Sequence, residues 1–150
     1  MSADVNGFPM PLFDRLAASG EAWLPGNDAL RQSVEQELSR LLNTRSRLTF
    51  EAFARIDGTV IDYGIPDFSE RSLRSDTDRD AIAGVVRRAI MMFEPRLSEP
   101  TVTFTLPSPG KNPALLIGGK LHAGASGRPV FFEMAPDGEG AADPRWAEQV

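Results

Sequence analysis

The order of apolar periodicities along the chain is the feature that most constrains its fold. Two segments carry apolar residues at the spacing of a helix, and the segments after them alternate as strands do. The first helical stripe consists of Leu30, Val34, Leu38, Leu41 and Leu42. The second consists of Ile82, Val85, Val86, Ala89, Ile90 and Phe93. One apolar stripe on each helix predicts that both helices pack against a common core.

Capping signals place the ends of the first helix. It is expected to begin near Asn27 or Asp28, since either side chain can accept a hydrogen bond from an N–H group of the first turn. Its stripe stops at Leu42, and Asn43, Thr44 and Arg45 are expected to terminate it. These three residues are therefore interpreted as structural.

The second helix has a capping signal at its start and a proline at its end. It is expected to begin near Thr77, which has the spacing of a capping box with Asp80. Pro95 disfavours helical backbone in Glu94, the residue before it. This helix is therefore expected to end within residues 93–97.

The C-terminal half carries the pattern of a small sheet. Residues 101–106 alternate between threonines and apolar residues, which predicts a half-buried strand. Further strands are expected at 114–122 and 130–135, with turns at 107–113 and 124–129. Consecutive strands joined by short turns predict an antiparallel meander. Two amphipathic helices packed on a small antiparallel sheet of about three strands define an α+β fold.

The connection between the helices has no clean period. Residues 45–75 are expected to be irregular, with a possible short strand formed by Val60, Ile61 and Tyr63. Gly64 and Pro66 are expected to shape a turn in which the Tyr63 side chain packs with its hydroxyl hydrogen-bonded. The expected organisation is a flexible N-terminus, a single domain and an acidic flexible tail, at residues 1–11, 12–135 and 136–150.

Composition excludes several classes of function. A chain of 150 residues has the size of one domain, and it contains no cysteine, which rules out thiolate metal sites and disulfides. Its net charge of −5 makes it a poor candidate for binding nucleic acid. No apolar run approaches the roughly 18 residues of a membrane span, and no secretory signal is evident. We therefore expect a cytoplasmic protein without membrane insertion.

Motifs that carry chemistry are scarce in this sequence. Its only histidine, His122, lies in a predicted strand and cannot build a zinc site by itself. Phosphate-binding and dinucleotide-binding glycine motifs are missing. Alternating Asp76, Asp78 and Asp80 lack the glycine and glutamate of a calcium loop, so helix capping explains them better. We predict no catalytic residue, no metal and no cofactor.

A glycosidase is the enzymatic alternative. Such an enzyme needs a carboxylic acid that donates a proton and a second carboxylate about 5 to 9.5 Å from it. Glu94 is the candidate acid, with Asp67 or Asp62 as its partner. Arg96 stands two residues from Glu94, and a nearby guanidinium favours the ionised form of a carboxyl group, which opposes the role of an acid.

Three short strings stand together in one order: Leu41–Arg45, Asp62–Asp67 and Phe93–Leu97. With them the chain resembles the baseplate wedge family of contractile phage tails and type VI secretion systems, and within it the TssE group. The Glu94-Pro95-Arg96 tripeptide after an apolar helix is the most specific of these marks, and the resemblance covers roughly residues 12–135.

The resemblance implies a small α+β domain, similar to the part of a sheath protein that exchanges strands with its neighbours. It implies a structural subunit that docks with other wedge proteins and initiates polymerisation of the contractile sheath. The implied partners are the wedge proteins TssF, TssG and TssK and the sheath proteins TssB and TssC. A wedge subunit of a contractile phage tail or a related particle is an alternative, and some phage relatives have carried a lysozyme label.

The same resemblance implies a partner-binding role for Glu94, Pro95 and Arg96. In this interpretation Pro95 fixes a turn that presents Glu94 and Arg96 to a partner as a charged pair. In the alternative interpretation, the two charged residues cap the helix and tie it to the irregular connection.

Overall fold

The computed structural model describes residues 8–9, 23–24, 27–55, 59–105, 109–110, 113–123 and 126–135. The rest of the N-terminal 26 residues and the tail at 136–150 lie outside the described residues, and so does Leu106. Before the first long helix, β1 (Phe8–Pro9) and β2 (Trp23–Leu24) form a two-residue antiparallel ladder.

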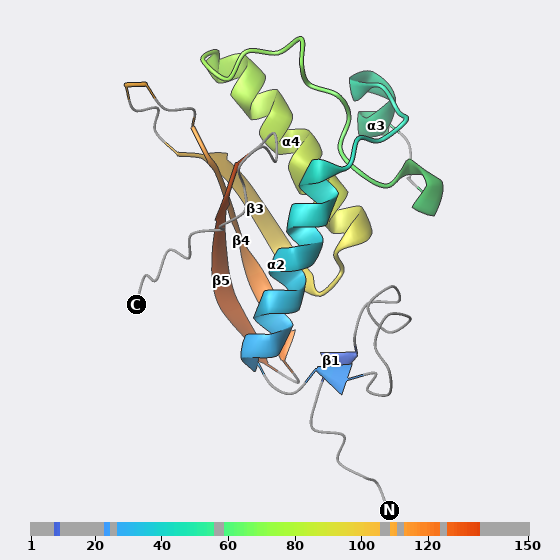
Figure 1. The fold of residues 1–150 in the computed structure, drawn as a ribbon, viewed down its shortest axis with the longest axis vertical. Coiled ribbons are helices and arrows are strands. Elements are labelled where there is room, and N and C mark those ends of the chain that lie inside the picture. Colours follow the sequence, from blue (N-terminus) through green and yellow to red (C-terminus); the bar gives the residue numbers. More distant parts are fainter. Residues whose placement is uncertain are drawn as a thin grey trace, which may run out of the picture.

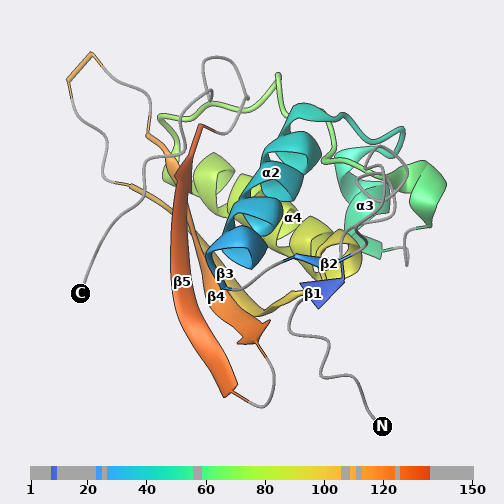
Figure 2. The same ribbon diagram turned by 60° about the horizontal axis from the view of Figure 1, so that its bottom comes forward.

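Two long helices lie on one face of a three-stranded sheet, as Figures 1 and 2 show. The helices are α2 (Asn27–Asn43) and α4 (Asp76–Phe93). The strands are β3 (Leu97–Phe104), β4 (Leu115–Ala123) and β5 (Ser126–Met134), in the spatial order β3-β4-β5 with antiparallel pairing throughout. This arrangement confirms the predicted α+β fold and the meander.

Helix α2 begins and ends where the sequence predicts. All five residues of its apolar stripe are buried, because the stripe faces the sheet and α4. At its C-terminus the Thr44 hydroxyl donates to the Arg40 carbonyl, and the Arg45 guanidinium donates to the Leu42 carbonyl. These bonds satisfy carbonyl groups that the end of a helix leaves without an intrahelical partner.

The start of α4 differs from the prediction. The capping residue is Ser75, whose hydroxyl accepts a hydrogen bond from the Asp78 N–H, so Thr77 lies inside the helix. The Asp78 carboxylate in turn accepts the Ser72 N–H. This side-chain contact closes the chain into a turn just before the helix and selects Ser75 over Thr77 as the cap.

Strands β3 and β5 begin earlier in the chain than the alternation of residues predicts. Strand β3 begins at Leu97 rather than at residue 101, because a bulge between Ser98 and Thr101 interrupts the alternation. Glu99 in this bulge has a positive φ of 48°. Strand β5 begins within the predicted turn, with Pro129 opposite Lys120. A proline is tolerated there because β5 is an edge strand of this sheet.

The core fills the space between the helices and the inner face of the sheet. Inward positions of β4 and β5 alternate with outward ones, and the buried apolar side chains of these strands are Leu115, Ile117, Leu121, Val130, Phe132 and Met134. The Gly118–Gly119 pair lies where neighbouring groups approach the β4 backbone closely. A Cβ atom on Gly118 would lie 2.7 Å from the Thr101 hydroxyl oxygen and 2.9 Å from the Phe131 ring.

The connection between the long helices is irregular but closely tied to the end of α2. It contains a short helix, α3 (Phe50–Arg55), and a 3₁₀ turn, η1 (Val60–Asp62). The predicted short strand at this position is therefore wrong: the Asp62 carboxylate accepts hydrogen bonds from the Thr59 N–H and hydroxyl, which curls the backbone into a capped turn.

Candidate partner-binding site

The turn after α4 holds an ion pair that faces the protein interior. Glu94 is the C-cap of α4, and only 1% of this residue is exposed. The Arg96 guanidinium donates from Nε to Glu94 Oε1 and from a terminal nitrogen to Oε2, at 2.9 Å in each case. The Arg96 backbone N–H adds a third hydrogen bond to Oε1 at 3.1 Å. Such a two-pronged pair fixes both the distance and the orientation of the guanidinium.

A third residue extends this pair to the first helix. The remaining guanidinium nitrogen of Arg96 donates to the Ser33 hydroxyl on α2 at 2.9 Å. Ser33 is itself buried. The Glu94–Arg96 pair thus connects the end of α4, the start of β3 and the middle of α2. The predicted tie to the irregular connection is made instead to α2.

The orientation of the pair decides which atoms a partner can reach. The Glu94 side chain is 2% exposed and the Arg96 side chain 19%. Pro95, at the tip of the turn, is exposed. The solvent-facing surface of the tripeptide therefore consists of Pro95 and part of Arg96, and Glu94 lies behind them.

The structure brings the three sequence strings together in pairs. Arg45 and Ile65 form an isolated parallel bridge, which joins the first string to the second. The Tyr63 ring meets Phe93 edge to face at 5.2 Å, which joins the second string to the third. The Tyr63 hydroxyl donates to Glu37 Oε1 at 2.7 Å, as predicted for a packed tyrosine. Burial, and after it the Glu37 carboxylate, raises the pKa of Tyr63 well above its ordinary value.

Asp62 is a second buried carboxylate in the same region. Besides the Thr59 contacts, it accepts a hydrogen bond from Arg47 Nε at 2.8 Å. The Thr59 backbone N–H and then the Arg47 and Thr59 side chains hold the pKa of Asp62 below its ordinary value, against the effect of burial. The Ser46 hydroxyl donates to the Asp62 carbonyl and ties the turn to the chain after α2.

The carboxylates proposed for a glycosidase serve separate structural roles. Asp67 is exposed, and the Ser69 N–H and hydroxyl donate to it and lower its pKa. Asp62 caps the 3₁₀ turn, and both Glu94 oxygens accept from Arg96. The three carboxyl groups share no hydrogen-bond partner among the contacts of the described residues. Each is engaged by local donors, which is the arrangement of structural carboxylates.

Replacing Asp62 with asparagine is expected to change how stability depends on pH. A lowered folded-state pKa means that Asp62 stabilises the fold fully above its ordinary value of 3.8, and that this contribution is lost as pH falls through the lowered folded value. Thermal melts between pH 7 and pH 2 should show a lower Tm for Asp62→Asn at pH 7 and a shallower fall in acid. Asp80→Asn, at an exposed helical position, is the control, and equal pH slopes for wild type and Asp62→Asn would contradict the assignment.

Other candidate groups have structural surroundings. His122 Nε2 is hydrogen-bonded to the Ser98 hydroxyl at 2.7 Å on the exposed face of the sheet. Within the described ranges, no group of three or more histidine, aspartate or glutamate residues is placed to hold a metal ion. Nor does any helix among the described residues have the length and apolarity needed to cross a membrane.

Sequence reasoning missed the partners of the predicted site. Ser33 and Glu37 carry no motif, and both lie on the flank of a helix whose apolar stripe gives the only visible signal. Arg47 falls in the irregular connection, where no period indicates which side chains turn inward. The arginine that follows Glu94 in the tripeptide was the available clue that its carboxylate is paired locally.

Comparison with known protein families identifies the family of this chain. The family model for the baseplate wedge protein gp25 matches residues 28–118, which span α2, the connection, α4, β3 and the first part of β4. The chain belongs to this family of baseplate wedge proteins. A search of curated proteins and a search of solved structures each found no match.

This result agrees with the resemblance drawn from the three strings, because the TssE group belongs to the same family. The family is one of structural baseplate proteins, which supports a structural role in the baseplate of a contractile phage tail or a type VI secretion system. It also implies interaction with other baseplate proteins and is consistent with a protein that is not an enzyme.

Proposed function

We propose that this chain is the TssE subunit of a type VI secretion system, which docks with the wedge proteins TssF, TssG and TssK in the cytoplasm and starts the polymerisation of TssB and TssC into a sheath. The observation that carries the proposal is the Glu94-Pro95-Arg96 turn, whose buried ion pair holds one end of a family-matched domain in a fixed shape. The order of the three strings, which resembles the TssE group, supports the baseplate role, and it is shared with wedge subunits of phage tails.

The turn is proposed as the surface that docks with another wedge protein. Pro95 and the exposed part of Arg96 make the contact, and Glu94 acts behind them by fixing the guanidinium. A group held in one orientation before binding loses less conformational freedom when it binds, so a preformed arginine contact favours affinity.

Strand β5 is proposed as the edge to which a sheath protein adds a strand. Both β3 and β5 lie at the edges of the described sheet. The β3 edge is interrupted by the bulge after Ser98, and Arg87 already donates to the Pro100 carbonyl there. Strand β5 pairs without a bulge, and beyond Pro129, which has no N–H to donate, residues 130–134 offer backbone groups without interruption to an incoming strand.

The proposal is tested by affinity purification of the tagged, full-length protein from its native cells. Wild-type protein is expected to recover wedge and sheath proteins. Pro95→Glu places a charge on the exposed tip without removing the Glu94–Arg96 pair, so it should keep a near-native Tm but lose the wedge proteins. Asp80→Arg on the exposed side of α4 is the matched control and should recover them normally.

The set of recovered proteins distinguishes the two settings that the family allows. Recovery of phage tail proteins in place of secretion-system proteins would assign the chain to a phage baseplate. Normal recovery by a stably folded Pro95→Glu variant would remove the docking role from this turn and leave the family assignment intact.

A further inference from the structure

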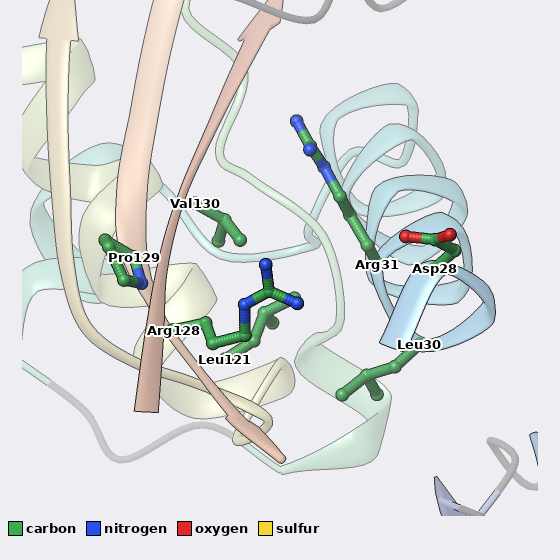
Figure 3. A pocket seen from close by; sticks show the side chains of 7 residues that line it. All are labelled: Asp28, Leu30, Arg31, Leu121, Arg128, Pro129 and Val130. Atoms are coloured by element: carbon green, nitrogen blue, oxygen red, sulfur yellow. The ribbon is translucent and has the colours of Figure 1, made fainter. Parts of the chain in front are cut away.

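A cleft opens between the start of α2 and the start of β5, at the end of the sheet (Figure 3). It has a volume of about 90 Å³. Its apolar side chains are those of Leu30, Leu121 and Val130, which are all buried. Asp28 and Arg31 contribute from α2, and Arg128 and Pro129 from β5. The cleft thus combines an apolar floor with charged groups at its rim.

Arg128 stands at a position where folding alone favours an apolar residue. It pairs with Leu121 across β4 and β5, so the two side chains share the inner face of the sheet. The next inward residues of β5, Val130 and Phe132, are buried. Arg128 instead is exposed, and Figure 3 shows its guanidinium extending into the space between β5 and α2.

The Arg128 guanidinium has no hydrogen bond or ion pair within the part of the chain that the structure describes. The other arginine of the lining, Arg31, already acts on the Glu35 carboxylate, whose ionised form it favours. A guanidinium in this setting is suited to a carboxylate, which it can bind through two parallel hydrogen bonds. Arg128 is therefore the group of this cleft that is complementary to a carboxylate.

We infer that this cleft recognises an acidic side chain of a partner protein, carried on an extended segment together with an aliphatic side chain two residues away. Residues two apart point to the same side of an extended chain, so one would meet Arg128 while the other covers the apolar floor. Strand β5 is an edge strand of the described sheet, and its start lines the cleft, which gives such a segment a place to lie. This inference rests on the proposed function, and it adds the chemistry of the segment that is recognised.

A charge-reversal experiment on the full-length protein tests the inference. Arg128→Glu should weaken binding of the recovered partner at least tenfold in a purified binding assay, and Arg128→Lys should weaken it less, because an ammonium keeps the charge but not the two-pronged geometry. Arg74→Glu, another exposed arginine, is the control and should bind as the wild type does. Raising the salt concentration should weaken the wild type more than Arg128→Glu.

A photo-crosslinking residue in place of Pro129, at the exposed rim of the cleft, identifies the segment. The crosslinked partner peptide is expected to contain Asp or Glu two residues from an aliphatic residue. Changing that acidic residue to lysine should restore binding to Arg128→Glu. A crosslinked peptide without an acidic residue would overturn the inference.

The outcomes separate this inference from the proposed function. If the wild type recovers wedge or sheath proteins and Arg128→Glu recovers them equally well, the cleft has no role and the proposed function stands. If the folded wild type recovers neither kind of protein, both proposals fail together.

Discussion

Replacing Arg96 with alanine is expected to lower the free energy of unfolding by about 3 kcal/mol. The change would leave the Glu94 carboxylate buried with its principal donors removed, and the Ser33 hydroxyl without its guanidinium partner. An uncompensated buried charge is among the most destabilising defects that a single substitution can create. For a chain of this size the Tm should fall by roughly 6–12 °C.

The measurement is chemical unfolding followed by circular dichroism, with a double-mutant cycle. The cycle compares Glu94→Leu, Arg96→Met and the variant that carries both changes. The double variant should lose clearly less stability than the sum of the two single losses, because no charge is then left buried. Lys120→Ala breaks the ion pair with Glu99, whose side chains are 52% and 73% exposed, and should remain near wild type. Additive effects of the two single changes would show that the pair is not coupled.

This prediction also governs any functional test of the tripeptide. Loss of assembly in an Arg96→Ala variant has two possible causes, a lost contact or a destabilised fold. Pro95→Glu avoids this ambiguity because the exposed tip lies outside the ion pair. A stable Pro95→Glu variant that no longer binds partners would assign the docking role to the surface of the turn.

Replacing Gly64 with alanine is expected to destabilise the fold by about 3 kcal/mol or more. Gly64 has a φ of +115°, a backbone conformation that residues with a side chain rarely adopt. An added Cβ would also lie 2.5 Å from the Thr44 carbonyl oxygen and 2.8 Å from the Ser46 nitrogen. Both atoms belong to the backbone, so a rotamer change cannot relieve the overlap. The bonds between Thr44, Ser46 and Ile65 should break first.

Two further glycines provide controls that separate backbone strain from steric overlap. Gly110 has a φ of +74° but open space around it, so its alanine variant measures the backbone strain alone. Gly84 is exposed in α4 with nothing within 4 Å, and alanine there should stabilise the helix by about 0.5–1 kcal/mol. Urea melts should therefore rank Gly64→Ala well below Gly110→Ala, and Gly84→Ala highest. Wild-type stability for Gly64→Ala would contradict the close packing of the connection against α2.

The helices and the sheet could be predicted because burial there follows a period. The stripe from Leu30 to Leu42 faces the core as expected, and α2 ends at Asn43, where the stripe stops. The meander follows from consecutive alternating segments. The start of β3 could not be predicted in this way, because the bulge at Glu99 breaks the alternation between Leu97 and Thr101.

The site was predicted as a string of residues, and its geometry was not. The sequence places Arg96 beside Glu94, but it does not indicate that the carboxylate turns inward or that Ser33, 63 residues away, completes the contact. The cap at Ser75 depends on a side-chain contact between Asp78 and Ser72, which forms only once the chain has turned. Contacts between separate segments decide these features, and they leave no period in the sequence.

The order of α2 and the sheet along the chain has a consequence for its synthesis on the ribosome. Helix α2 emerges first, but the sheet residues that cover its apolar stripe are made after residue 97. The sheet pairs only neighbouring segments, and such local contacts form rapidly once the strands are complete. Until then α4 is the only long element made after α2 that can cover its stripe, so the interval before the strands are complete is when the chain is most open to aggregation and to chaperones.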